Sequence, residues 1–254
     1  MRRCGGRVED RDLAAAYDAT QRNRIAARMP FNLPRITKIL LIANIVGFAL
    51  QWLLGDARMR LFELWPLGDG LYDPSGSVPS FMPWQLLTYG FLHDPSNIFH
   101  LAFNMLALVM FGAPLEYTWG ERRFLTYYLV CVFGAGLCQL LVGSIAVSQG
   151  ELAYRTVGAS GGVFGLLLAY GMLFPNQRVM LLFPPIPMKA RTLVILYGVF
   201  ELSLGLTGLQ PGVAHFAHLG GMLFGWLLIR YWRGQPPFGK RKPPDRRPPL
   251  RVVR

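Results

Sequence analysis

Charged residues are scarce in this sequence. Only 16% of its 254 residues are Asp, Glu, Lys or Arg, whereas 52% are hydrophobic, which exceeds the apolar share of an ordinary soluble domain. A helix that crosses a bilayer needs about 20 predominantly apolar residues. Uncharged runs of about that length occupy residues 39–55, 124–150, 156–177 and 202–229. The sequence therefore predicts an integral membrane protein.

Cysteine and histidine are also rare, with three and four copies. Cys4 lies in a basic segment, while Cys131 and Cys138 are two helical turns apart on one face of an apolar run, too far for a disulfide bond. The spacing of these residues matches no zinc site, and the HExxH motif is absent. We therefore expect no disulfide framework, no metal and no cofactor.

A net charge of +12 would suit a nucleic-acid partner, but the basic residues cluster in the two terminal segments. They are not interleaved with aromatic residues, as they are in single-strand binders. Basic segments that flank membrane spans are typical of cytoplasmic tails. We therefore predict a lipid bilayer and no nucleic acid as partner. The first 35 residues are polar, so no cleaved signal peptide is expected.

The pattern predicts an all-α membrane protein with six transmembrane helices. A basic N-terminal segment (1–35) precedes a six-span domain (36–232), and a Pro-rich basic tail that we expect to be disordered (233–254) follows it. A long loop between the first two spans (56–96) is too interrupted to cross and is predicted to lie in the membrane interface. The predicted spans are residues 36–54, 98–115, 124–142, 158–174, 192–206 and 213–232.

Charge asymmetry predicts the orientation of these spans. If the N-terminus is cytoplasmic, the external segments contain only Arg58, Arg60 and Arg155 of the 26 Lys and Arg residues. The remaining basic residues lie inside, as the positive-inside rule expects. Both termini are therefore predicted to be cytoplasmic.

Polar groups inside membrane spans are costly, so each is a site hypothesis. His100 and Asn104 lie near the start of the second span, Ser160 near the start of the fourth, and His215 and His218 near the start of the sixth. All three spans run inward, and at 1.5 Å per residue these groups share a depth of up to roughly 10 Å below the outer surface. Groups far apart in sequence are thus predicted to meet at one level.

Ser160 lies in the run Gly158 to Gly162 at a predicted helix start. There it can act as a nucleophile whose neighbouring N–H groups hold an oxyanion, or it can simply line a close helix contact. Small residues four apart, such as Gly221 and Gly225 in the sixth span, let helices approach closely. Ser160 can therefore reach a histidine that accepts its proton.

Periodicity does not choose between His215 and His218 as that base, because both lie on one helix face. His100 and Asn104, four residues apart, also share a face and can donate hydrogen bonds to an oxyanion. Alone they would be read as an interhelical hydrogen-bond pair. Beside Ser160 and a histidine at matched depth, they are read as catalytic. Glu201, in the fifth span, is read as a structural inward-facing group.

Three short motifs resemble the rhomboid family of intramembrane serine proteases, with bacterial members as the nearest type. They are HLAFNM beginning at His100, GASG beginning at Gly158, and AHLGG beginning at Ala217. The resemblance also includes Glu116 and Gly120 and extends over residues 36–232.

The resemblance implies a Ser–His dyad with Ser160 as nucleophile and His218 as general base. It makes His100, Asn104 and the Ser160 N–H the oxyanion donors, with Gly158 and Gly161 supporting the nucleophile. His215 is implied to be a supporting polar residue. The implied substrates are transmembrane proteins, and the implied location is a bacterial plasma membrane. The resemblance leaves the oligomeric state open.

Two positions depart from the family pattern. Phe164 stands where relatives often have Tyr, and its ring is still expected to stack on His218. Trp84-Gln85 stands where some relatives have Trp-Arg. The alternative function is that of a non-catalytic rhomboid-like protein that binds membrane clients. A transporter is disfavoured because no inverted repeat or charged pore lining is visible.

Overall fold

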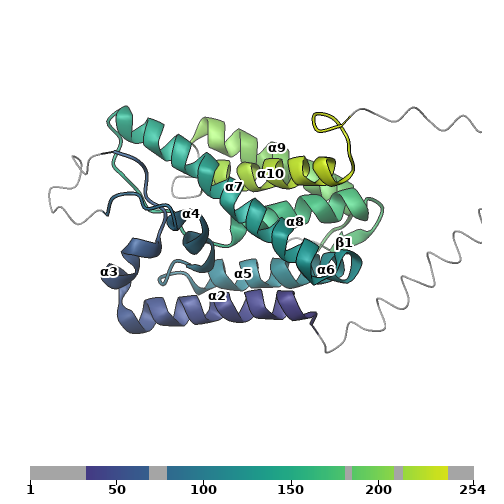
Figure 1. Cartoon of the computed structure of the whole chain (residues 1–254), viewed down its shortest axis with the longest axis horizontal. Coiled ribbons are helices and arrows are strands. Elements are labelled where there is room, and N and C mark those ends of the chain that lie inside the picture. The colour runs from purple at the N-terminus through teal and green to yellow at the C-terminus, as the bar shows by residue number, and fades with distance from the viewer. Residues whose placement is uncertain (1–32, 69–78, 181–184, 209–213, 240–254) are drawn as a thin grey trace, which may run out of the picture.

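The computed structural model describes residues 33–68, 79–180, 185–208 and 214–239. These ranges are mostly helical, as predicted (Figure 1). A short antiparallel hairpin that the sequence did not predict joins two of the helices, with β1 at Arg178–Met180 and β2 at Pro187–Lys189.

The first described helix, α2 (Arg35–Leu54), follows Pro34 and ends at Gly55, whose φ is +81°. Two of the free N–H groups in its first turn are bonded to a distant carboxylate. Glu116 accepts hydrogen bonds from the Ile36 N–H at 2.8 Å and from the Thr37 N–H and hydroxyl at 2.7 Å each. A carboxylate at a helix N-terminus is favoured by both hydrogen bonding and the helix dipole. Glu116 therefore fixes the start of α2 against the second span.

The predicted second span is a continuous helical path of three parts: α5 (Ile98–Ala107), the π-helical segment η3 (Leu108–Gly112) and α6 (Ala113–Trp119). It covers the predicted span and continues four residues beyond Leu115. Next comes α7 (Glu121–Ser148), which has 28 residues and extends past both predicted ends. Cys131 and Cys138 on α7 are free thiols.

The C-terminal half contains α8 (Ser160–Leu173), α9 (Ala190–Thr207) and α10 (His215–Trp232). In Figure 1, α7 crosses the bundle between the α2–α5 side and the α9–α10 side. The Tyr127 hydroxyl on α7 donates to the Gly165 carbonyl on α8 at 2.8 Å. The start predicted for the sixth span, Val213, lies outside the described residues.

The described part of the loop between α2 and α5 contains four short helices: α3 (Asp56–Met59), η1 (Arg60–Phe62), α4 (Gln85–Thr88) and η2 (Tyr89–Phe91). Gln85, one of the two departures from the family pattern, is fully buried here. Its amide accepts from the Trp65 N–H at 3.3 Å and donates to the Leu61 carbonyl at 3.3 Å. Gln85 thus joins the two halves of this loop.

In the described part of the chain, four helical stretches are long and apolar enough to cross a membrane: Arg35–Leu54, Ile98–Trp119, Glu121–Ser148 and Ala190–Thr207. The apolar helix α8 is shorter, and α10, which carries two histidines, is not among the four. Large apolar side chains on α2 and α9 are exposed, among them Leu53, Val199 and Phe200. Such surfaces belong in lipid, so the chain is an integral membrane protein.

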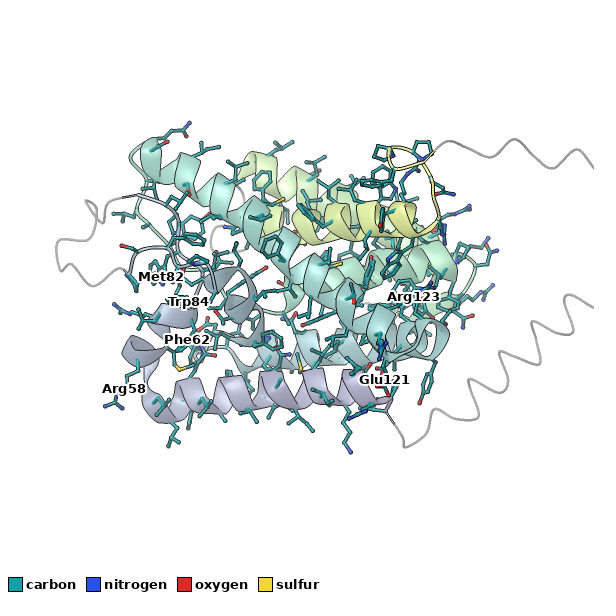
Figure 2. All side chains as sticks on the ribbon, viewed as in Figure 1. Arg58, Phe62, Met82, Trp84, Glu121 and Arg123 are labelled. Carbon is teal, nitrogen blue, oxygen red and sulfur yellow. The ribbon has the colours of Figure 1, made fainter. Side chains whose placement is uncertain are left out.

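The start of α2 and the end of α10 lie at the same end of the bundle (Figure 1). Glu121 and Arg123 lie at this end too, whereas Arg58, Phe62, Met82 and Trp84 lie at the opposite end (Figure 2).

Candidate active site

Ser160 is the first residue of α8, and the chain before it is held by backbone hydrogen bonds. The Gly158 N–H donates to the Tyr89 carbonyl at 3.0 Å, and Thr156 pairs with Leu64 in an isolated antiparallel bridge. Both partners belong to the loop between α2 and α5. That loop therefore fixes the position of the start of α8, and with it the position of Ser160.

Gly158 allows a close approach of His100. Its φ is +132°, and a Cβ atom built there would lie 2.9 Å from His100 Nε2 and 3.6 Å from Ser160 Oγ. Any larger residue would be strained in this conformation and would displace the imidazole. The GASG motif thus brings Ser160 and His100 to the same place.

His218 approaches Ser160 because α8 and α10 are in contact at glycine. A Cβ atom on Gly221 would lie 1.9 Å from the Gly161 carbonyl oxygen, so no side chain fits between the helices. The distance from His218 Nε2 to Ser160 Oγ is 2.8 Å, which is that of a hydrogen bond. Of the two candidate histidines, the one that contacts the serine is therefore His218.

Phe164, one turn after Ser160, stacks on His218 as expected. The two ring centroids are 4.2 Å apart and the rings are within 6° of parallel. The stacking restricts rotation of the imidazole, and the missing tyrosine hydroxyl plays no part in this contact.

His100 and Asn104 belong to α5, and both line the same cavity as Ser160. The Asp94 N–H lies 3.5 Å from His100 Nδ1 and points its hydrogen at it, which leaves the proton of a neutral imidazole on Nε2, facing Gly158. The Asn104 amide donates one hydrogen to the His100 carbonyl at 2.8 Å and has a second to offer.

A cavity of about 480 Å³ opens in front of these residues, between α5, α8 and α9. The lining residues with polar side-chain groups are His100, Asn104, Ser160 and Tyr197. Apolar side chains make up nearly all the rest, including Phe103, Met110, Leu167 and Leu193. The cavity thus offers an apolar surface with hydrogen-bond donors at one end.

A buried carboxylate, which the sequence analysis predicted to face inward but did not place beside the histidines, lies next to this site. Glu201 on α9, read as a structural group, has its Oε2 atom 2.7 Å from His215 Nδ1 and 2.9 Å from His218 Nδ1. The sequence did contain a signal for this role, because an ionisable residue inside an apolar span is a candidate site residue.

A residue that the sequence analysis missed is His93, in the segment between η2 and α5. It is fully buried, and its ring lies edge-on to that of His100, with centroids 5.1 Å apart. Burial, reinforced by His100, lowers the pKa of His93 to about 3. His93 is therefore neutral at physiological pH.

Within the described ranges, the one group of three potential metal ligands is Glu201, His215 and His218. The two nitrogen-to-oxygen contacts have the lengths of direct hydrogen bonds. We therefore describe these side chains as bonded to one another.

Comparison with known proteins gives a consistent result. A model of the Rhomboid domain matches residues 80–234. RHOMBOID-like protein 2 of Arabidopsis thaliana is 34% identical over 79% of this chain and 67% of its own length. Rhomboid protease AarA of Providencia stuartii is 33% identical over 57% of this chain and 54% of its own length.

Coverage is lower for RHOMBOID-like protein 1 of Arabidopsis thaliana, which is 32% identical over 74% of this chain. The match covers only 43% of that relative, so this chain spans less than half of its length.

Proposed function

This chain belongs to the rhomboid family, and from that premise we propose that it is an intramembrane serine endopeptidase. It hydrolyses peptide bonds in or near transmembrane segments of other membrane proteins. The observation that carries the proposal is the 2.8 Å distance between Ser160 Oγ and His218 Nε2. A hydroxyl in contact with a neutral imidazole is an activated nucleophile.

In the proposed reaction, Ser160 Oγ bonds to the scissile carbonyl carbon as its proton passes to His218 Nε2. The proton then moves to the leaving nitrogen, the C–N bond breaks, and an acyl-enzyme remains. Water, deprotonated by His218, attacks the ester carbonyl and releases the acid and Ser160. This water must come from the outer membrane surface, since lipid supplies none.

The negative charge on the tetrahedral intermediate is held by His100 Nε2–H, the Asn104 amide and the Ser160 N–H. Support comes from the shared cavity lining and from the position of Ser160 at the positive end of α8. Losing one such donor costs about 10²- to 10³-fold in rate. Gly158 and Gly161 allow the close packing that aligns these groups, and His215 supports the base.

We propose the six-span architecture with α8 as its shortest span. Fourteen residues at about 1.5 Å each make a helix of roughly 21 Å, which is shorter than the hydrocarbon core of about 30 Å. If its inner end reaches the inner surface, Ser160 lies some 10 Å below the outer one. The loop of residues 56–96 then lies in the outer interface.

Substrates are transmembrane segments with a helix-weakening stretch, because an intact helix hides its carbonyls. Leu193 and Tyr197 line the cavity from α9, so entry beside this helix is the proposed route. We assign the protease domain to residues 36–232, with cytoplasmic segments 1–35 and 233–254. The proposed location is a bacterial plasma membrane, with lipid and substrate as partners.

The test is cleavage of a model transmembrane substrate in detergent. Ser160→Ala and His218→Ala should each lower the rate by at least about 10³-fold while the protein stays folded. Ser148→Ala is the matched control, because this exposed serine bonds only to the Ile145 carbonyl of its own helix. Cleavage by either variant at the control rate would reject the proposal.

A client-binding protein without catalytic activity is the second candidate, and a fluorophosphonate probe separates the two. Labelling of the wild type but not of Ser160→Ala supports the enzyme. Equal labelling of both proteins contradicts it.

A further inference from the structure

Glu201 is a charged residue in the apolar helix α9. Its neighbours Phe200 and Leu202 are 58% and 47% exposed, whereas Glu201 is only 6% exposed and turns toward α10, beside which α9 packs (Figure 1). An isolated carboxylate is very costly in such a place, so its partners must compensate for it.

Both partners are imidazoles on α10. His215 and His218 are three residues apart and so project from one helix face. Both place Nδ1 within hydrogen-bonding distance of the same carboxylate oxygen, Oε2, at 2.7 Å and 2.9 Å. The His215 contact is an aligned hydrogen bond, while the His218 contact has the distance but not the alignment. One carboxylate oxygen can accept two such bonds.

A continuous chain of polar atoms thus leads from Ser160 to α9. Ser160 Oγ lies 2.8 Å from His218 Nε2, and His218 Nδ1 lies 2.9 Å from Glu201 Oε2. A carboxylate facing Nδ1 fixes the ring proton there, because the carboxylate can only accept. The Nε2 lone pair then points at the serine hydroxyl, which is the tautomer a general base needs.

We propose that Glu201 is a positioning residue that makes this site a Ser160–His218–Glu201 triad, in place of the dyad that the family resemblance implies. The inference rests on the proposed protease function. Glu201 holds the tautomer of His218 and faces the positive charge that forms on it.

In the proposed triad, one proton moves from Ser160 through His218 to the leaving nitrogen. During attack, the Ser160 proton goes to His218 Nε2, and the ring becomes an imidazolium whose Nδ1–H lies beside Glu201 Oε2. The carboxylate stays ionised throughout and takes no proton. When the C–N bond breaks, the Nε2 proton goes to the leaving nitrogen and His218 is neutral again.

His215 and Phe164 complete the surroundings of His218. The aligned bond from His215 fixes the carboxylate without touching the serine, and Phe164 covers one face of the His218 ring. His100, on α5, is a further titratable group that interacts electrostatically with His218. Among the described residues, the negative charge facing this imidazole therefore comes from Glu201.

The experiment compares kcat and KM for wild type, Glu201→Gln and Glu201→Asp on a transmembrane substrate. Gln keeps the size but removes the charge, so we expect kcat to fall about 10²- to 10⁴-fold with KM within about threefold of wild type. Asp keeps the charge on a shorter side chain, so kcat of Glu201→Asp should be at least tenfold higher than kcat of Glu201→Gln. Ser203→Ala, an exposed residue on the same helix that bonds to the Val199 carbonyl, should match wild type.

Glu201→Gln with wild-type kcat would overturn the inference. So would equal losses in Gln and Asp that follow their melting temperatures, because this pattern marks a purely structural role. Should Glu201→Gln fail to fold, the equal-sized pair Glu201→Asp and Glu201→Asn carries the test: a kcat at least tenfold higher in Asp than in Asn at unchanged KM supports the triad, and equal kcat in the two variants rejects it. A wild type no more active than Ser160→Ala would instead reject the protease function itself.

Discussion

At the residue scale, the site depends on imidazoles in three different settings. His218 touches Ser160 and is covered by Phe164, His100 faces Gly158, and His93 is enclosed without a hydrogen-bond partner for either ring nitrogen among the described residues. The sequence motifs predicted the first two. His93 lies outside those motifs, and only its burial distinguishes it.

His93 should make stability depend on pH. Its pKa is about 3 when folded and 6.5 when exposed, so below pH 6.5 protons bind the unfolded chain in preference. Its contribution is therefore complete above pH 6.5 and is lost as pH falls toward 3, by at most about 1.4 kcal/mol per pH unit. Melting temperatures of wild type and His93→Leu, compared at pH 7.5 and pH 5, should show the larger loss in wild type. Parallel losses would contradict this account.

At the element scale, the distance between α8 and α10 decides whether Ser160 and His218 meet. The small-residue pattern predicted a close approach, and the contact of Gly221 with Gly161 confirms it. The π-helical segment η3 and the hairpin before α9 were not predicted. The spacing of apolar residues predicts neither of these elements, because both depend on how neighbouring helices pack.

Gly221→Ala should separate these two helices. The added methyl would lie 1.9 Å from the Gly161 carbonyl oxygen, so we expect a loss of about 1–3 kcal/mol in stability and a large loss of cleavage activity. Gly198→Ala on α9 is the matched control, because its methyl would meet only Met222 at an ordinary 3.6 Å. Melting temperature and cleavage rate measure both. Equal effects of the two substitutions would show that helix spacing is not the cause.

At the scale of the whole molecule, basic residues and apolar helices set the orientation. Arg123 lies at the end of the bundle where α2 begins and α10 ends, and Arg58 lies at the other (Figure 2). The positive-inside rule assigns the first of these ends to the cytoplasm.

Labelling of single cysteines tests this orientation. In a chain whose own cysteines are replaced, Arg58→Cys should react with a membrane-impermeant maleimide on intact cells. Arg123→Cys should react only after the cells are permeabilised. Both positions are exposed at the protein surface, so access differs only by side of the membrane. The reverse pattern would invert the topology.

The sequence by itself determined the membrane class and most of the helices, and it predicted a shared depth for Ser160, His100 and His218, because apolar run length and residue rise are local properties. Periodicity left His215 and His218 open and the family motif implied His218, but only the tertiary structure shows the contact with Ser160 and what lies behind it. Both candidates occupy one face of α10, and the choice follows from the glycine contact between α8 and α10. Glu201 became part of the site for the same reason: helix packing alone turned it toward His218.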